Sequence, residues 1–230
     1  MASTTVEFAV QMTCESCVNA VKKSLANISG VQNVQVYLDE QRVVVQSTLP
    51  TLQVLKVLES TGKKVAVKGY AGGQAAVSIL EAGKVGLQGV VRLIQPTPDI
   101  CIIDGTIDGL EKGSYRAFVH ECGDISQGCE NVGNIFNPLA TQNGRLYGDL
   151  GTINSDDNNR AVFRFEDKVI KVSDLIGRAF VVAKNSGSEE AKRVACGVIA
   201  RSAGLFQNPK TICACDGTTI WDEAGKKSAL

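Results

Sequence analysis

Residues 4–70 switch between two spacings of apolar residues. Apolar side chains occupy every second position, as in half-buried strands, over residues 6–12, 34–38, 43–45 and 65–67. A spacing of three or four, typical of amphipathic helices, recurs over residues 18–28 and 52–58. Gly30 and Gly62 follow these helical segments, where glycine commonly ends a helix. The order βαββαβ predicts an α+β, ferredoxin-like N-terminal domain over residues 1–70.

The pattern changes after residue 70. The Gly-rich stretch GYAGG at residues 69–73 is typical of a hinge, and we expect a linker over residues 71–75. Residues 76–200 contain short β-rich runs between Gly, Asn and Asp clusters, which predicts an all-β antiparallel sandwich or barrel. Residues 201–230 have no core-forming length and are expected to form a short irregular tail.

Charge and composition exclude several classes of partner. The 230 residues carry 24 Lys plus Arg and 24 Asp plus Glu, so the net charge is zero and no basic face for nucleic acid is expected. No apolar run approaches the ~18 residues of a membrane span. The N-terminus lacks the pattern of a signal peptide. With eight cysteines, this favours a cytoplasmic, reducing location, where cysteines more often bind metal or react than form structural bridges.

The ratio of cysteine to histidine limits the metal chemistry. There are eight cysteines and one histidine, so a zinc or copper site with two or three histidines cannot form within one chain. Any metal site must therefore use sulfur, which selects soft ions such as Cu(I) or zinc, or an iron–sulfur cluster.

Cys14 and Cys17 lie where the first strand is expected to end and the first helix to begin. The partial positive charge of a helix N-terminus stabilises thiolate, the form that binds Cu(I). Half of a zinc site or a thioredoxin-like redox pair are the alternatives. No second cysteine pair lies within residues 1–70, and Met12-Thr13 precedes Cys14 where thioredoxins carry an aromatic residue. Met12 falls on the apolar alternation and is expected in the core.

The M-x-C-x-x-C motif at residues 12–17 resembles that of the heavy-metal-associated domains of copper chaperones and copper ATPases. The resemblance covers residues 4–70 and implies that Cys14 and Cys17 bind Cu(I). Thr61-Gly62-Lys63 matches a loop near the metal in that family. Lys63 would then offset the negative charge of a bis-thiolate copper site. The alternative, to which we give equal weight, is that Lys63 is a solvated lysine at a helix end.

Residues 76–200 resemble the Cu/Zn superoxide dismutases, which are Greek-key β-sandwiches. The matching segments are FVHECGD at 118–124, GC at 128–129, FNP at 136–138, GDLG at 148–151, IGR at 176–178 and RVACGVI at 193–199. The metal ligands of that family are mostly absent, because its histidines align with Phe118, Ile135, Asn143, Leu146 and Ala183.

Only His120 and Asp149 remain of those ligands. Two donors cannot hold a redox copper and a zinc ion together, so we expect neither dismutase activity nor zinc in this domain. His120 is expected to pack or hydrogen-bond inside the sandwich, and Asp149 to cap a turn.

The same resemblance implies other roles in the middle domain. Cys129 and Cys196 occupy the positions of the family's intrasubunit disulfide, with Arg193 nearby, and the alternative is that both stay reduced. Cys101 and Cys122 are expected to be isolated thiols. The segments that form the dimer contact of dismutases persist here. This implies docking on a dismutase as a heterodimer, with a homodimer as the competing interpretation. The residues of these segments are Gly123, Asp124, Ser126, Ile176, Gly177, Gly197, Val198 and Ile199.

The tail carries a second thiol pair, Cys213 and Cys215. Cysteines two apart bridge each other only with strain, but they can bind one soft ion or form mixed disulfides. Alone this signal is weak. Together with ARSAGLFQNP at 200–209 and IWDE at 220–223, it resembles the tail of the copper chaperones for superoxide dismutase. Trp221 is either an anchor on a surface or an exposed aromatic.

The three parts resemble that one family in one order. The resemblance implies a metallochaperone rather than an enzyme, which delivers Cu(I) to Cu/Zn superoxide dismutase and promotes its intrasubunit disulfide. Cys213 and Cys215 would carry out copper transfer and disulfide exchange. The alternative is a soft-metal-buffering or thiol-redox protein with a homodimeric sandwich scaffold.

Overall fold

The computed structural model describes residues 2–138, 144–184, 192–208 and 219–223. The described residues form two compact units. The first contains residues 2–73 together with 202–208 and 219–223, and the second contains residues 74–201 where they are described. Among the described helices, none has the length and apolar character needed to cross a membrane.

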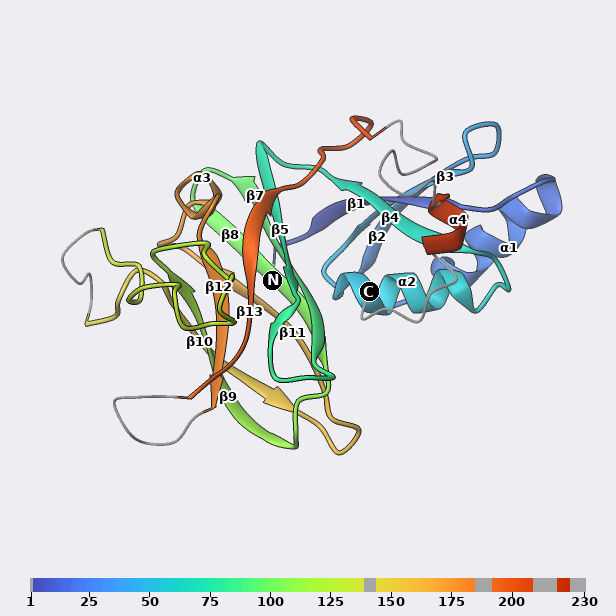
Figure 1. The fold of residues 1–230 in the computed structure, drawn as a ribbon. Helices are drawn as coiled ribbons and strands as arrows, with labels where there is room; N and C mark the ends of the chain where they lie inside the picture. Colours follow the sequence, from blue (N-terminus) through green and yellow to red (C-terminus); the bar gives the residue numbers. More distant parts are fainter. Residues whose placement is uncertain (1, 139–143, 185–191, 209–218, 224–230) are drawn as a thin grey trace. The chain divides into compact units, whose positions relative to one another are not determined.

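The first unit has the predicted ferredoxin-like order (Figure 1). Its elements are β1 (Thr4–Val10), α1 (Glu15–Ala26), β2 (Val31–Tyr37), β3 (Arg42–Ser47), α2 (Thr51–Glu59) and β4 (Val65–Tyr70). The strands form an antiparallel sheet in the order β2-β3-β1-β4, so β4 lies at one edge. The apolar faces of the helices are buried with one face of β1, in a core that includes Phe8, Val21 and Leu58.

The second unit is an antiparallel β-structure (Figure 1). It consists of β5 (Gln74–Leu80), β6 (Ala82–Gly83), β7 (Gln88–Thr97), β8 (Ile100–Asp108), β9 (Gly113–His120), β10 (Asp149–Ser155), β11 (Arg160–Asp167), α3 (Val172–Leu175), β12 (Ala179–Lys184) and β13 (Arg193–Arg201). The strand order is β10-β9-β12-β13-β5-β7-β8-β11, and β6 also pairs with β13. Because β10 and β11 also lie beside each other, the sheet curves around one core. This confirms the predicted sandwich.

Two sequence expectations need adjustment. Strand β5 begins at Gln74, inside the segment expected to be a linker over residues 71–75. The described part of the tail packs on the first unit and contains a short helix, α4 (Ile220–Glu223), rather than being irregular throughout. Strand pairing and burial of Ile220 decided these outcomes, and neither is visible as a periodicity in the sequence.

Candidate metal centre and docking surface

Cys14 and Cys17 meet at the start of α1. Cys14 has extended backbone angles (φ −160°, ψ 168°) as the residue before the helix, and Cys17 lies in its first turn. Their Sγ atoms are 3.6 Å apart. Cys14 is exposed and Cys17 is buried, so one sulfur faces incoming ligands while the other is shielded. Met12 lies in the core, as predicted.

The surroundings of both thiols favour the thiolate. A hydrogen bond from the Thr13 backbone lowers the pKa of Cys17 to about 6, with further contributions from the Lys63 ammonium and from Cys14. The Ser16 hydroxyl, 2.9 Å from Cys14 Sγ, and then the Cys17 backbone lower the pKa of Cys14. By contrast, burial raises the pKa of the Cys101 thiol to about 12, so it stays protonated.

The thiol pair is an open site. Within the part of the chain that the structure describes, no cluster of three or more His, Cys, Asp or Glu side chains could hold a metal. A Cu(I) ion accepts low coordination by soft sulfur ligands, whereas structural zinc requires four donors. Two sulfurs with one of them exposed suit an ion that must leave again.

We expect Lys63→Gln to raise the pKa of Cys17, because it removes the ammonium that stabilises the thiolate. With a pKa of about 6, Cys17 is mostly thiolate at pH 7, so the variant holds less of the reactive form. Alkylation of Cys17 by iodoacetamide in the metal-free full chain should slow by about 3-fold or more at pH 7. The rates should converge above pH 9, where both proteins are ionised.

Lys64→Gln is the matched control, because it removes the neighbouring exposed lysine, which is not among the groups that lower the pKa of Cys17. Equal slowing in the two variants would indicate a general charge effect and contradict the specific role of Lys63.

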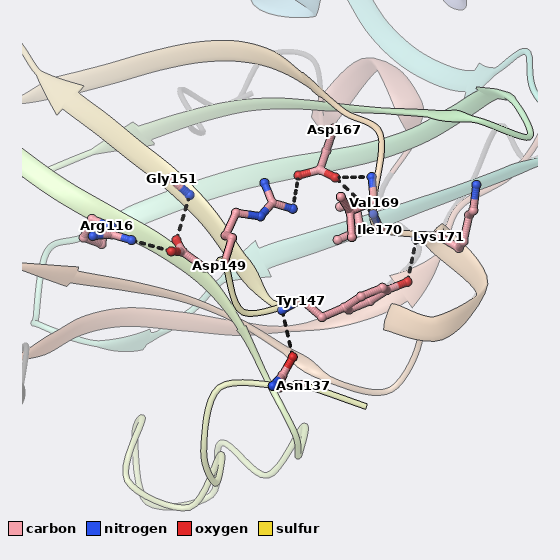
Figure 2. Close-up of polar contacts among 10 residues, drawn as sticks. Arg116, Asn137, Tyr147, Asp149, Gly151, Asp167, Val169, Ile170 and Lys171 are labelled. Carbon is pink, nitrogen blue, oxygen red and sulfur yellow. Dashed lines mark hydrogen bonds and ion pairs between the residues drawn. The ribbon is translucent and has the colours of Figure 1, made fainter. Parts of the chain in front are cut away.

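The face of the sandwich that carries copper in dismutases is occupied differently here. Arg116, Phe118 and His120 alternate along one face of β9. The Arg116 guanidinium is 2.5 Å from Asp149 Oδ2, and the Gly151 N–H donates to Oδ1 of the same carboxylate at 3.1 Å (Figure 2). Asp149 therefore has a fixed cation as its partner. Arg116 was missed by the sequence reasoning, although its two-residue spacing from Phe118 places it on this face.

His120 is buried and used structurally. Its Nδ1 lies 2.9 Å from the Gly133 carbonyl oxygen, and burial lowers the pKa of the imidazole. Ile135 pairs with His120 through an isolated β-bridge, and Ala183 is buried in β12. Of the other positions where dismutases carry histidine, Leu146 is partly exposed and Asn143 lies outside the described residues.

The segment before Asp149 is held by local polar contacts (Figure 2). Asn137 Oδ1 accepts from the Tyr147 N–H at 3.1 Å, and the Tyr147 hydroxyl accepts from the Lys171 N–H at 2.9 Å. That hydroxyl also donates to Asp174 Oδ2 at 2.7 Å. Asp167, nearby, accepts from the N–H groups of residues 169 and 170 and pairs with Arg145 at 2.7 Å. Hydrogen bonds and an ion pair between protein groups therefore hold the segment that leads to Asp149.

A disulfide joins Cys129 and Cys196, with their Cα atoms 5.8 Å apart. Arg193 secures the loop that carries Cys129. Its Nη1 donates to the Cys129 carbonyl at 2.8 Å, and its Nη2 donates to the Gly133 carbonyl at 2.9 Å. The disulfide and Arg193 therefore fix the loop that leads into the candidate docking segments. Cys101 is a buried free thiol and Cys122 an exposed one.

The structure brings the three candidate docking segments together. A Cβ on Gly123 would lie 2.4 Å from the Gly177 carbonyl oxygen and 3.3 Å from the Val198 side chain. The Gly177 N–H donates to the Ile199 carbonyl at 2.9 Å. Ile176 is 37% exposed at the rim of this surface. Asp124 holds the first segment by accepting from the Ser126 hydroxyl at 2.6 Å, a bond that lowers the pKa of Asp124.

Two residues change the picture of this surface. The side chain of Ile199 is fully buried in the sandwich core, so only its backbone can contribute to the candidate docking surface. Ile79, which the sequence reasoning missed, is 57% exposed, and its carbonyl oxygen is in the place where a Cβ on Gly197 would lie. Its alternation with the buried Leu80 in β5 was the available signal.

Comparisons with known proteins agree with both units. The family model of the heavy-metal-associated domain matches residues 7–64, and that of copper/zinc superoxide dismutase matches residues 87–199. The copper chaperone for superoxide dismutase of Homo sapiens is 48% identical over 250 aligned residues, covering 98% of this chain and 90% of the relative. The chain belongs to the family of copper chaperones for superoxide dismutase.

Relatives of lower identity also align over nearly the whole chain. The chloroplastic/cytosolic copper chaperone for superoxide dismutase of Arabidopsis thaliana is 38% identical over 94% of this chain and 69% of its own length. The superoxide dismutase 1 copper chaperone of Saccharomyces cerevisiae is 30% identical over 97% of this chain and 94% of its own. Cys213 and Cys215 lie outside the described residues, so the structure gives the geometry of the thiol pair Cys14 and Cys17 but not that of the tail pair.

Proposed function

We propose that this chain is a copper metallochaperone that delivers Cu(I) to a Cu/Zn superoxide dismutase and promotes formation of its intrasubunit disulfide. The observation that carries the proposal is the combination of an open thiolate pair with a dismutase fold whose own ligand positions are occupied by other residues. The relatives are named as chaperones and not as enzymes, which supports a role without turnover of a small substrate.

Copper is the cargo of the first unit. Cys17, with a pKa of about 6, is mostly thiolate at neutral pH, and the pKa of Cys14 is lowered from its usual value by Ser16 and the Cys17 backbone. Soft sulfur ligands favour Cu(I) over harder ions. The exposure of Cys14 leaves one side of the ion accessible to the sulfur ligands of another site. Ligand exchange through shared thiolates then moves the ion without releasing it to water. A Cu(I) thiolate site also requires a reducing compartment, which supports a cytoplasmic location.

The second unit is proposed to bind the target, without zinc and without dismutase activity. Asp149 is paired with Arg116, and His120 is hydrogen-bonded to Gly133, so both remaining donors have protein partners. The close packing of Gly123, Gly177 and Val198 supports pairing with a dismutase subunit in the way that such subunits pair with each other.

Cys213 and Cys215 are proposed to act at the target. They bind the ion during transfer and take part in disulfide exchange. Once the ion has left, dioxygen oxidises the two tail thiols to a disulfide and takes up their two electrons and two protons as hydrogen peroxide. A target thiolate attacks this tail disulfide, and a mixed disulfide between tail and target forms as one tail thiolate leaves. The second target thiolate then displaces the remaining tail sulfur, so the two target thiols are oxidised to a disulfide while the tail disulfide is reduced to two thiols. Each exchange step forms one S–S bond and breaks another.

The test mixes the full chain with copper-free, disulfide-reduced dismutase and supplies Cu(I). We expect the Cys213→Ser/Cys215→Ser variant to pair with the dismutase while activating it to less than about a tenth of the wild-type level, because serine oxygen neither binds Cu(I) well nor exchanges with disulfides. Dismutase activity and the redox state of the target cysteines are both measured. Cys122→Ser, at an exposed free thiol, is the matched control and should activate normally.

The alternative, a metal-buffering or thiol-redox protein with a homodimeric sandwich, gives opposite results. Absence of a heterodimer, together with full activation by the Cys213→Ser/Cys215→Ser variant, would contradict the chaperone proposal. Two tightly bound metal ions in the second unit would contradict the proposed absence of a dismutase site.

A further inference from the structure

One face of the N-terminal sheet is covered although no helix of the βαββαβ motif lies on it. Val6, Phe8 and Val10 alternate along β1 on the face that forms the core with α1 and α2. Glu7 and Ala9 lie on the opposite face, yet they are only 1% and 4% exposed. A two-layer domain leaves this face in water unless another segment covers it.

Residues 203–208 of the C-terminal segment pair with the edge of this sheet. The Tyr70 N–H donates to the Ala203 carbonyl at 3.3 Å, and the Leu205 N–H donates to the Tyr70 carbonyl at 3.0 Å. The resulting bridge between Tyr70 and Gly204 is parallel. Because β4 lies at the edge of the sheet, its outer backbone groups can pair with such a segment.

The carboxylate of Glu7 anchors the added segment. Its Oε2 accepts a hydrogen bond from the Phe206 N–H at 2.6 Å, and the Lys68 Nζ lies 3.9 Å from its Oε1. Hydrogen bonds to a buried charged acceptor are stronger than those between neutral groups. The Arg42 guanidinium lies 4.4 Å from the ring centres of both Tyr37 and Phe206, which adds a cation–π contact beside this bond.

The end of the described chain returns to the same face. Ile220 in α4 packs with Ala9 of β1 and Ala66 of β4, and Trp221 lies partly buried against this cluster. Ala9 and Ala66 are paired neighbours in the sheet, so their small side chains leave room for the helix. The segments on both sides of residues 209–218 thus contact one sheet face of the first unit.

We propose that the outer face and the β4 edge of the N-terminal sheet form a docking site for the chain's own C-terminal segment. Glu7 and Gly69 determine its specificity: Glu7 supplies the acceptor, and Gly69 supplies the space, since a Cβ there would lie 2.5 Å from the Gly204 carbonyl oxygen. The metal-binding domain therefore has a second binding surface, separate from its thiols. This inference does not depend on the proposed copper delivery.

The test uses hydrogen exchange on the metal-free full chain. In the wild type, the amides of Leu205 and Phe206 should be protected, because both N–H groups have acceptors. In Gly69→Ala, the new methyl group prevents close approach of Gly204, and these amides should exchange about 10–100-fold faster, while those of β1 stay protected. Trp221, the single tryptophan, should shift its fluorescence to longer wavelength as α4 leaves the sheet.

Gly73→Ala is the matched control, because a Cβ at Gly73 meets no atom within 4 Å and the substitution should change neither signal. Glu7→Ala is a second, independent variant, which removes the acceptor of the Phe206 N–H and should give the same loss of protection. Unprotected Leu205 and Phe206 amides in the wild type would overturn the proposal by themselves. Equal effects of Gly69→Ala and Gly73→Ala would also overturn it. None of these readouts involves copper or dismutase, so their failure would leave the proposed function standing.

Discussion

Replacing Cys14 and Cys17 by serine is expected to lower the Cu(I) affinity of the N-terminal site by about 100-fold or more, since mutation of supporting residues around a metal already costs about 10–100-fold. Both sulfurs lie 3.6 Å apart at the helix start, close enough for one ion to bind both. Serine keeps the shape but provides a hard, protonated oxygen in place of a soft thiolate.

The affinity is measured by competition with a chromogenic Cu(I) chelator. The starting protein carries Cys213→Ser and Cys215→Ser, so that only the first pair remains, and Cys14→Ser/Cys17→Ser is added to it. Cys122→Ser, added instead, is the control for loss of an exposed thiol and should leave the affinity unchanged. Stoichiometric, equally tight Cu(I) binding after loss of Cys14 and Cys17 would show that the helix-start pair is not the metal site.

Ile176→Glu is expected to weaken pairing with a dismutase subunit by about 100-fold, which corresponds to about 3 kcal/mol. Ile176 is 37% exposed beside Gly177, in the surface formed with Gly123 and Val198. A contact that buries this position would have to desolvate the new carboxylate without a designed partner, and an unpaired buried charge costs several kcal/mol. The monomeric sandwich should tolerate the change because the side chain is at the rim.

Sedimentation of the full chain with copper-free dismutase measures this pairing. Val162→Glu is the matched control, since Val162 is 44% exposed on β11, away from β12 and β13 in the strand order. It introduces the same charge on the same domain and should leave pairing intact. If Val162→Glu weakens pairing and Ile176→Glu does not, the docking surface lies elsewhere on the sandwich.

The local features of the candidate site were predictable, because they depend on residues close together in the chain. The C-x-x-C spacing at a strand–helix junction defines which two sulfurs can meet, and the structure places them 3.6 Å apart. The role of Lys63 was left between two interpretations. Its contact with Cys17 depends on how the loop after α2 folds back toward α1, which spacing along the chain does not specify.

Contacts between distant segments were the part that the sequence reasoning missed. Ile199 was expected at the docking surface because the resemblance places residues 197–199 in the dimer contact of dismutases, but the pleat of β13 turns its side chain into the core. Arg116 was overlooked because its partner Asp149 is 33 residues away in the chain. The cover on the N-terminal sheet was missed for the same reason, since Glu7 and Phe206 are 199 residues apart.

The sequence by itself determined the two domain folds, the identity of the first thiol pair and the absence of most dismutase ligands, because periodicity, spacing and residue type are local properties. Only the tertiary structure decided which protein groups pair with the remaining donors Asp149 and His120, which side chains stay exposed, and where residues 202–208 and 220–223 pack. These outcomes depend on the register of paired strands and on burial, which arise only when segments far apart in the chain come together.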